Sequence, residues 1–194
     1  MYVSLIRHGK TKGNMEGRYI GRTDEGLLQE EKEEIKRLVP PKADIIFISP
    51  MIRCVETCKL MYPEQNYVII DELKEIDFGE FEYKSYEDLK DNPDYQAWID
   101  SNGILAFPSG EGRDDFIKRC INGFEKGIQK AMEESCEEVV FIIHGGSMMA
   151  ILDRFSYPNE EFFHWQVKNK NGYRGRIEVV NERMVISSLC RIFH

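Results

Sequence analysis

The stretch EVVFII at residues 138–143, followed directly by HGG at residues 144–146, decides the fold class. Its unbroken run of β-branched and aromatic side chains is typical of a strand that is buried on both faces. A second such run, DIIFIS at residues 44–49, leads into Pro50, a residue that suits the first turn of a helix. Strands of this kind lie in parallel sheets that helices cover on both faces, so the sequence predicts an α/β protein.

Strands and helices alternate along the rest of the chain. Further strands are predicted at residues 2–6 and 67–70, and helices at residues 26–39, 50–61, 111–134 and 147–155. Residues 176–180 and 184–189 are predicted to form a closing hairpin. This alternation predicts a three-layer α/β/α sandwich around a mostly parallel central sheet. Residues 81–110 are less regular and rich in aromatics, and we interpret them as a cap-like insertion in a single domain of residues 1–194.

The composition is that of a folded protein rather than a disordered one, with 42% hydrophobic and 31% charged residues. The sequence has no apolar run long enough to span a membrane, and Arg7 and His8 come too early for a signal sequence. We therefore expect a cytoplasmic protein without a membrane partner. A monomer and a homodimer both remain open.

The charge distribution favours a small anionic ligand over a polyanion. The formal net charge of −8 argues against nucleic-acid binding, which requires a basic face. Residues 1–22 nevertheless contain a single acidic side chain, Glu16, against five basic ones: Arg7, Lys10, Lys12, Arg18 and Arg22. This local excess of positive charge indicates a focused anion site.

The sequence contains no motif for metal binding or thiol chemistry. Of its five cysteines, Cys54 and Cys58 lie four residues apart on a predicted helix, and we interpret both as small buried side chains. No CxxC pair or HExxH motif is present, so neither a metal nor another cofactor is expected. No arginine follows a cysteine at the spacing C-x5-R, which excludes the loop of the cysteine phosphatases.

Five side chains with catalytic potential follow the predicted strands. Arg7 and His8 follow the first strand, and Arg53 lies in the first helical turn after the second. Glu75 comes shortly after the third strand, and His144 directly follows the fourth. Ligands of parallel sheets bind outside the carboxyl ends of the strands, so we expect these side chains to meet at one edge. Taken singly, each has a structural explanation, but their joint placement favours function.

This set of residues suits phosphoryl transfer. Two guanidiniums can hold phosphate oxygens through charge-assisted hydrogen bonds. A neutral imidazole can attack phosphorus and form a covalent intermediate, while a second imidazole, if protonated, can stabilise charge on the equatorial oxygens. A carboxylic acid can protonate the departing alkoxide. The N–H groups of the helix predicted to begin at Ser147 can add to the phosphate cradle.

The same segments resemble the motifs of the histidine phosphatase superfamily, which includes the cofactor-dependent phosphoglycerate mutases. LIRHGKT at residues 5–11, followed by Asn14, is similar to the opening motif of that superfamily. Its later motifs resemble SPMIRCVET at 49–57, LKEIDFG at 73–79 and IHGG at 143–146, in family order. One departure is Lys10, where the motif commonly carries glutamate.

The resemblance implies a role for each matching residue. His8 would be the phosphorylated nucleophile and Glu75 the proton donor. The phosphate pocket would be lined by Arg7, Arg53 and His144, with Asn14 and the backbone of Gly145 nearby. The resemblance also implies that the reaction needs no metal.

Within the superfamily, further segments resemble the α-ribazole phosphatases. These are FGEFE at 78–82, YQAW at 95–98, PSGEG at 108–112 and HWQV at 164–167. The resemblance implies a phosphomonoesterase whose small phosphorylated substrate is α-ribazole 5′-phosphate, an intermediate of cobalamin biosynthesis. The alternatives are a broad-specificity or sugar-bisphosphate phosphatase, a phosphoglycerate mutase, and a non-catalytic module that binds a phosphorylated ligand. Tyr95 and Trp98 either stack on a flat base or pack the cap, and both readings remain open.

Overall fold

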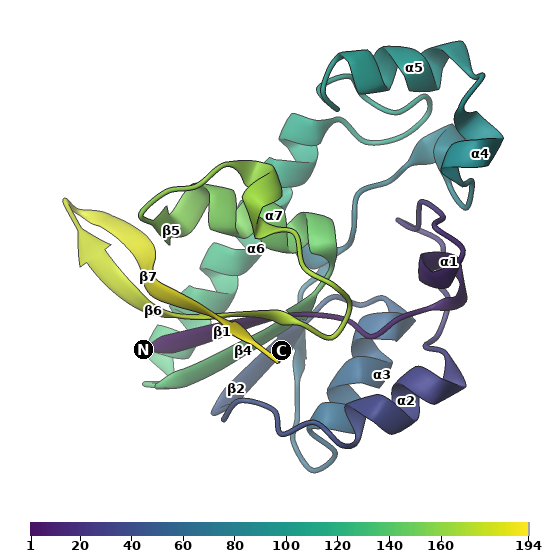
Figure 1. Cartoon of the computed structure of the whole chain (residues 1–194). Coiled ribbons are helices and arrows are strands. Elements are labelled where there is room, and N and C mark those ends of the chain that lie inside the picture. The colour runs from purple at the N-terminus through teal and green to yellow at the C-terminus, as the bar shows by residue number, and fades with distance from the viewer. Residues whose placement is uncertain (194) are drawn as a thin grey trace.

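A seven-stranded sheet forms the centre of the computed structural model, which describes residues 1–193 (Figure 1). The strands are β1 (Tyr2–Arg7), β2 (Ile45–Ile48), β3 (Val68–Ile69), β4 (Glu138–Ile143), β5 (Ser156–Tyr157), β6 (Gly172–Val180) and β7 (Arg183–Ile192). Their order across the sheet is β3-β2-β4-β1-β6-β7-β5. β6 runs antiparallel to its neighbours β1 and β7, and all other pairs are parallel. The mostly parallel sheet predicted from the sequence is therefore confirmed.

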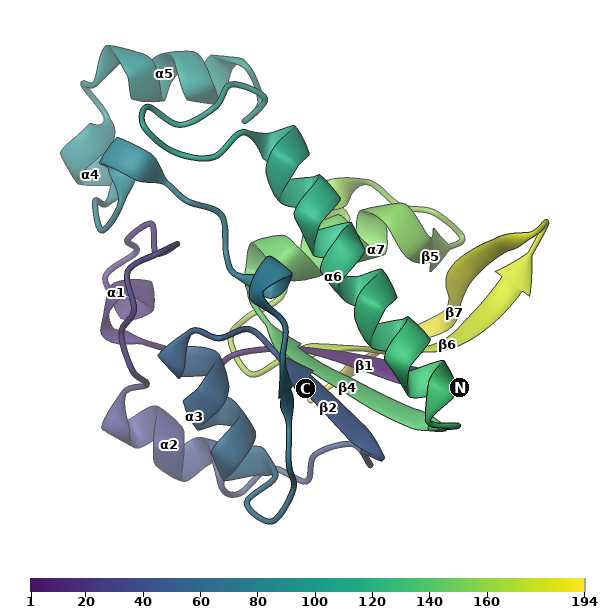
Figure 2. The ribbon, with the colours of Figure 1, turned by 180° about the vertical axis from the view of Figure 1, so that it is seen from behind.

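Helices cover both faces of this sheet. α2 (Gln29–Ile35) and α3 (Ile52–Met61) lie on one face, and α6 (Arg113–Glu133) and α7 (Gly145–Phe155) lie on the other. Figure 2 shows the same three layers from behind. The predicted α/β/α sandwich is confirmed. None of the helices within residues 1–193 is long and apolar enough to cross a membrane.

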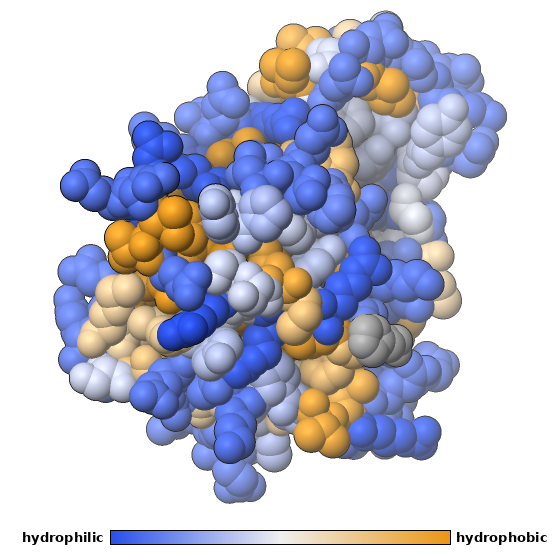
Figure 3. Space-filling model, turned by 60° about the vertical axis from the view of Figure 1, so that its left-hand side comes forward, coloured by the Kyte–Doolittle hydropathy of each residue, from blue (hydrophilic) through white to orange (hydrophobic). Residues whose placement is uncertain are grey.

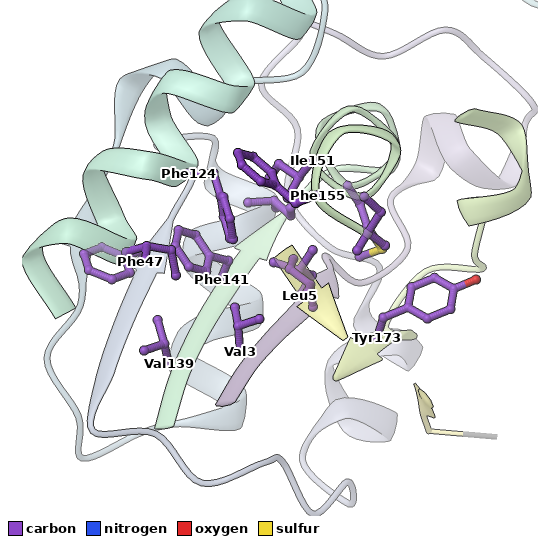
Figure 4. Close-up of a cluster of buried hydrophobic side chains, with 14 of the residues drawn as sticks. Val3, Leu5, Phe47, Phe124, Val139, Phe141, Ile151, Phe155 and Tyr173 are labelled. Atoms are coloured by element: carbon purple, nitrogen blue, oxygen red, sulfur yellow. The ribbon is translucent and has the colours of Figure 1, made fainter. Parts of the chain in front are cut away.

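Successive side chains of the central strands enter two separate cores, because residues in a strand alternate between the faces of the sheet. On the side of α6 and α7, Phe141 of β4 packs against Phe47 and Phe124, with ring centroids 5.0 Å apart in each pair (Figure 4). On the opposite side, Cys54 and Cys58 are fully buried in the core beneath α3. The two cysteines are thus packing residues, as their spacing indicates.

Several boundaries differ from the predicted ones, and α7 begins at Gly145 rather than at the predicted Ser147, because the helix starts directly after His144. The helix predicted at residues 26–39 spans only Gln29–Ile35, because Leu27 is drawn into a β-bridge with Thr11. The closing hairpin starts earlier than predicted, at Gly172, where β6 pairs with β1. Gly172 permits this pairing, since a Cβ there would lie 1.9 Å from the Leu5 carbonyl oxygen.

Residues 81–110 contain two helices, α4 (Tyr86–Leu89) and α5 (Pro93–Asp100), which project beyond the sheet (Figures 1 and 2). They share a small core of their own, formed by Phe81, Leu89, Tyr95 and Phe107. α5 begins where the side chain of Asn92 accepts a hydrogen bond from the Tyr95 N–H, with proline in the first turn. The remaining short helices are α1 (Lys12–Met15), η1 (Asp71–Leu73), η2 (Gly79–Phe81) and η3 (Phe162–Trp165).

Hydrophilic residues cover most of the face seen in Figure 3, with smaller apolar patches between them. This surface agrees with the high proportion of charged residues in the chain.

Candidate active site

The carboxyl ends of β1 and β4 bring two predicted histidines together. The two strands are parallel neighbours, and their register pairs Arg7 with Ile143. His8 and His144 each follow one of these paired residues, so the two imidazoles come to lie side by side. Their ring centroids are 5.1 Å apart, in an edge-to-face arrangement. The structure therefore brings His8 and His144 together at one edge of the sheet, as expected from the sequence.

The imidazole of His8 is buried and held in one tautomer. Its Nδ1 lies 2.7 Å from the carbonyl oxygen of Gly9, and because a carbonyl can only accept, Nδ1 carries the proton. Nε2 therefore carries the lone pair, and it has no hydrogen-bond partner within residues 1–193. Burial lowers the pKa of His8 well below its ordinary value, and the charges of Arg53 and Arg7 lower it further. His8 is thus a neutral imidazole with a free nitrogen.

His144 is also buried, and both of its ring nitrogens have partners. The guanidinium Nε–H of Arg53 donates to His144 Nδ1 over 3.3 Å, so the Nε2–H of His144 donates to the Ser49 hydroxyl at 2.7 Å. Burial, followed by the charge of Arg53, lowers the pKa of His144 well below its ordinary value. The structure therefore holds His144 neutral, in contrast to the protonated imidazole considered from the sequence.

Arg53 is a buried residue rather than a surface helix residue, with a relative exposure of 1%. Its guanidinium donates to the carbonyl oxygens of Thr23 at 2.8 Å and Gly21 at 2.9 Å. These backbone bonds fix the plane of the guanidinium beside His144. The hydroxyl of Thr57, one turn further along α3, accepts from the Gly9 N–H at 2.9 Å. This bond ties α3 to residues 8–11, the loop between β1 and α1 that we call the His8 loop.

Arg7 lies across the start of α7. Its Nη1 donates to the Val167 carbonyl at 2.7 Å, while its buried Nε–H has no hydrogen-bond partner among residues 1–193. A Cβ on Gly145 would lie 3.4 Å from the guanidinium carbon of Arg7, so this glycine sits in contact with the arginine. Burial lowers the pKa of Arg7, and nearby Glu75 opposes that change. An unpartnered, buried cationic N–H is suited to an anionic ligand.

Glu75 reaches the same helix start from the segment after η1. Its Oε2 accepts from the Gly146 N–H and its Oε1 from the Ile76 N–H, each at 3.0 Å. Gly146 leaves room for the carboxylate, because a Cβ there would lie 2.3 Å from Glu75 Oε1. Arg119 of α6 donates to the carbonyl of Glu75 at 3.0 Å and fixes its backbone. Glu75 is therefore a positioned carboxylate rather than a freely solvated one.

Asn14 lies in α1, close to the His8 loop. Its Oδ1 accepts from the Thr11 N–H at 3.3 Å and from the Asn169 side chain at 3.0 Å. Asn169 had no signal in the sequence, because it stands in an irregular segment without a strand or helix pattern. Ser49 and Thr57 lie within a motif that the sequence reveals, but only the fold shows that their hydroxyls accept from His144 and from the Gly9 N–H.

A cavity of about 1190 Å³ opens beside these residues. Four of the predicted site residues line it: Arg7, Asn14, Glu75 and Gly145. The other three, His8, Arg53 and His144, are almost completely buried and are not among the residues that line it. The aromatic part of the lining consists of Tyr19, Phe78, Trp98, Phe107, Phe116, Phe162 and Phe163.

The structure separates the two aromatic residues that the sequence left undecided. Tyr95 is only 2% exposed and packs within the cap. Trp98 lies against Tyr95 in a stacked arrangement, with ring centroids 5.8 Å apart, and it also lines the cavity. Of the two, Trp98 is the residue that a ligand in the cavity can reach.

The basic residues near the N-terminus are only partly directed at the site. Arg7, Lys10 and Arg18 line the cavity. Arg22 instead pairs with Asp77 at 3.0 Å, and Lys12 lies 3.7 Å from Glu16. Within residues 1–193, no group of three His, Cys, Asp or Glu side chains is placed to hold a metal ion.

Proteins similar to this chain include phosphatases of several specificities. It is 27% identical over 177 residues to the adenosylcobalamin/alpha-ribazole phosphatase of Escherichia coli (strain K12), covering 86% of this chain and 85% of that protein. It is 26% identical over 155 residues to phosphoserine phosphatase 1 of Hydrogenobacter thermophilus, covering 76% and 72%.

Two solved structures have the same fold. The alpha-ribazole phosphatase of Shigella flexneri superimposes with a TM-score of 0.81 at 23% identity, over 96% of this chain and 94% of that one. The phosphoglycerate mutase of Thermus thermophilus superimposes with a TM-score of 0.72 at 26% identity, over 96% and 97%.

The family model of the histidine phosphatase superfamily (branch 1) matches residues 3–190, nearly the whole chain. This match includes every segment that supplies a side chain to the site. The chain belongs to the histidine phosphatase superfamily.

Proposed function

We propose that the protein is a phosphomonoesterase that works through a phosphohistidine on His8. The observation that carries this proposal is the state of the His8 ring. Its Nδ1–H is bound to the Gly9 carbonyl, and its neutral Nε2 is free beside two arginines. A neutral imidazole fixed in this tautomer is ready to attack an electrophile without first losing a proton.

In the first step, Nε2 of His8 attacks phosphorus and the bond between phosphorus and the leaving oxygen breaks. Glu75 enters this step protonated and gives its proton to the leaving oxygen, which departs as an alcohol. Arg7 and Arg53 neutralise the charge on the transferred group. The phosphoryl group is then bonded to His8.

In the second step, water attacks phosphorus and the P–N bond breaks. Glu75, now ionised, accepts a proton from the water. Inorganic phosphate leaves, and His8 and Glu75 return to their starting states. The position of Glu75 on the cavity wall supports both roles, since the leaving group and the attacking water occupy the same side of the phosphoryl group in turn.

A His8→Ala variant tests this chemistry. Turnover should fall to background, whereas a matched variant of an exposed histidine, His164→Ala, should keep native activity. Phosphate label trapped during turnover should be acid-labile and located on His8. Label on another residue, or turnover by His8→Ala, would refute the proposed mechanism.

Metal independence is a separate part of the proposal. No step above uses a metal, because the arginines supply the positive charge that the phosphoryl group needs. Activity should therefore be the same in an excess of chelator. A loss of activity in chelator that is restored by added divalent cation would contradict this part.

For the substrate, we propose α-ribazole 5′-phosphate, with the reaction serving cobalamin biosynthesis. The aromatic lining of the cavity supports a leaving group that carries a flat base, since aromatic side chains stack on such rings. The relative from Escherichia coli is named for this substrate. We expect α-ribazole 5′-phosphate to exceed 3-phosphoglycerate and an aryl phosphate by about a hundredfold in kcat/KM, or about 2.7 kcal/mol.

The charge of the cavity favours a second candidate, a sugar-bisphosphate phosphatase. Lys10 and Lys168 line the cavity, and neither has an acidic partner among the residues that the structure describes. Two unpaired ammonium groups suit a second phosphate on the substrate. Higher kcat/KM for fructose 2,6-bisphosphate than for α-ribazole 5′-phosphate would favour this candidate. Isomerisation of 3-phosphoglycerate would indicate a mutase, and binding without turnover a non-catalytic module.

A further inference from the structure

We propose that Asn169 is a positioning residue that fixes the His8 loop and turns the amide of Asn14 toward the substrate phosphate. This inference rests on the proposed function, because it concerns the nucleophile and the phosphate pocket. Asn169 lies in the segment between η3 and β6, far from His8 in the sequence but in contact with it.

The side-chain nitrogen of Asn169 faces three oxygen atoms. Nδ2 lies 3.0 Å from Asn14 Oδ1, 3.2 Å from the His8 carbonyl oxygen and 3.4 Å from the Gly9 carbonyl oxygen. An amide has two N–H groups, so one bonds to Asn14 and the other is shared between the two carbonyls. All three neighbours are acceptors, which fixes the nitrogen on this side of the Asn169 amide.

These bonds also decide how Asn14 is oriented. Its Oδ1 accepts from Asn169 and from the Thr11 N–H, so these two donors fix the direction of the oxygen. The NH2 group of Asn14 is then left over. Because Asn14 lines the cavity together with Arg7, this NH2 is available to donate to a phosphate oxygen. Without Asn169, only the bond to Thr11 would oppose rotation of the Asn14 amide.

The contact with Gly9 reaches the nucleophile itself. The Gly9 carbonyl that accepts from Asn169 is the same one that accepts from His8 Nδ1–H and so selects the reactive tautomer. Backbone bonds hold this arrangement in place, since the Lys170 N–H donates to the Arg7 carbonyl at 3.0 Å. The segment that carries Asn169 is therefore fixed against the loop it positions.

A double-mutant cycle with Asn14 tests the proposal. Asn169→Leu keeps the size of the side chain and removes its N–H groups, and we expect kcat/KM to fall about tenfold to a hundredfold. The loss should be smaller in an Asn14→Ala background, because part of the effect of Asn169 passes through Asn14. A matched variant outside the cavity, Asn159→Leu, should keep native activity. Thermal unfolding of each variant separates positioning from loss of fold.

Two results would overturn the inference. One is an Asn169→Leu protein with activity within about twofold of native, and the other is an equal fold-loss in both backgrounds. If Asn169→Leu does not fold, Asn169→Asp serves instead, because it has the same shape but only acceptors while ionised. Native activity of Asn169→Asp at neutral pH would likewise overturn it.

NMR distinguishes failure of this inference from failure of the proposed function. The nitrogen chemical shifts of the His8 imidazole report which nitrogen carries the proton, whether or not the protein turns over a substrate. We expect Asn169→Leu to increase the fraction of His8 with its proton on Nε2. Unchanged shifts would overturn the positioning role, whereas a native protein without His8-dependent turnover would overturn the proposed function.

Discussion

Replacing Gly146 by alanine is expected to impair catalysis with little effect on stability. A Cβ at this position would lie 2.3 Å from Glu75 Oε1 and 3.0 Å from the ring of Phe116. The nearer atom is the end of a flexible side chain, so the carboxylate can move aside without disturbing the backbone. In moving, it would lose the hydrogen bond from the Gly146 N–H, which is 3.0 Å long.

The geometry sets the size of the effect. Relieving a contact of 2.3 Å requires a shift of about 1 Å, and misplacement of a catalytic group by that distance costs about a hundredfold in rate. A hydrogen bond to a charged group contributes about 1.5–3 kcal/mol, equivalent to a factor of about 10 to 150. Both estimates place the expected fall in kcat/KM for Gly146→Ala between about tenfold and a hundredfold.

The leaving group shows whether the loss comes from Glu75. An alkyl phosphate such as α-ribazole 5′-phosphate needs a proton donor for its departing oxygen, whereas p-nitrophenol leaves readily as an anion. Gly146→Ala should therefore lose most of its activity on the alkyl phosphate and much less on p-nitrophenyl phosphate. Rates of phosphate release from the two substrates, measured side by side, give the comparison.

Two neighbouring variants serve as controls. A Cβ on Gly145 would meet Arg7 only at 3.4 Å, an ordinary contact, so Gly145→Ala should lose less activity than Gly146→Ala. Gly112→Ala, at the start of α6, meets nothing closer than 3.9 Å and should behave as the native protein. An equal loss on both substrates, or native activity of Gly146→Ala, would show that the displaced carboxylate is not the proton donor.

Acidification is expected to destabilise the fold, because the unfolded chain binds protons near pH 6.5 on His8 and His144, whose pKa values burial lowers in the folded protein. The free energy of unfolding should fall as the pH drops below about 6.5, the value for the unfolded chain, and should continue to fall toward the lowered pKa values of the folded protein. The fall should be smaller in His144→Gln than in the native protein, and an equal fall would contradict this. Arg53→Lys should lower kcat/KM at least about a hundredfold, because an ammonium group cannot replace a planar guanidinium that bonds two backbone carbonyls. Native kinetics in that variant would show that the planar group is dispensable. Trp98→Ala should raise KM for α-ribazole 5′-phosphate but not for p-nitrophenyl phosphate, whereas Tyr95→Ala should mainly lower Tm. The reverse pattern would show that Tyr95, and not Trp98, contacts the ligand.

The central sheet was predictable because its strands are buried on both faces. β4 and β2 are continuous apolar runs, and both faces of each strand meet a helical layer. The helix predicted at residues 26–39 was less predictable, since Glu31 looks like part of a solvated charged face. In the fold Glu31 is only 5% exposed, and it accepts from the Lys10 N–H at 2.9 Å. Only the tertiary structure supplies that partner.

The residues of the candidate site likewise fall into a predictable and an unpredictable group. Side chains that directly follow a parallel strand were predictable, because the topology of the sheet brings His8 and His144 to one edge. Asn169 was not, because its segment has neither hydrophobic periodicity nor a turn signature. Its role depends on contact with a loop some 160 residues earlier in the chain.

The charge states of the site residues could not be predicted from the sequence either, and they determine which side chains supply positive charge to a phosphate in the proposed mechanism. Sequence reasoning placed two histidines and two arginines around a phosphate and left His144 free to be protonated. In the fold, one buried guanidinium donates to His144, and the same charge disfavours protonation of His8. In the proposed mechanism the positive charge near the phosphate therefore comes from Arg7 and Arg53 among these four, because arginine stays protonated across the physiological range. In the proposed mechanism the two residue types therefore have separate tasks: the arginines neutralise the anion, and the neutral imidazole of His8 keeps the lone pair needed for attack.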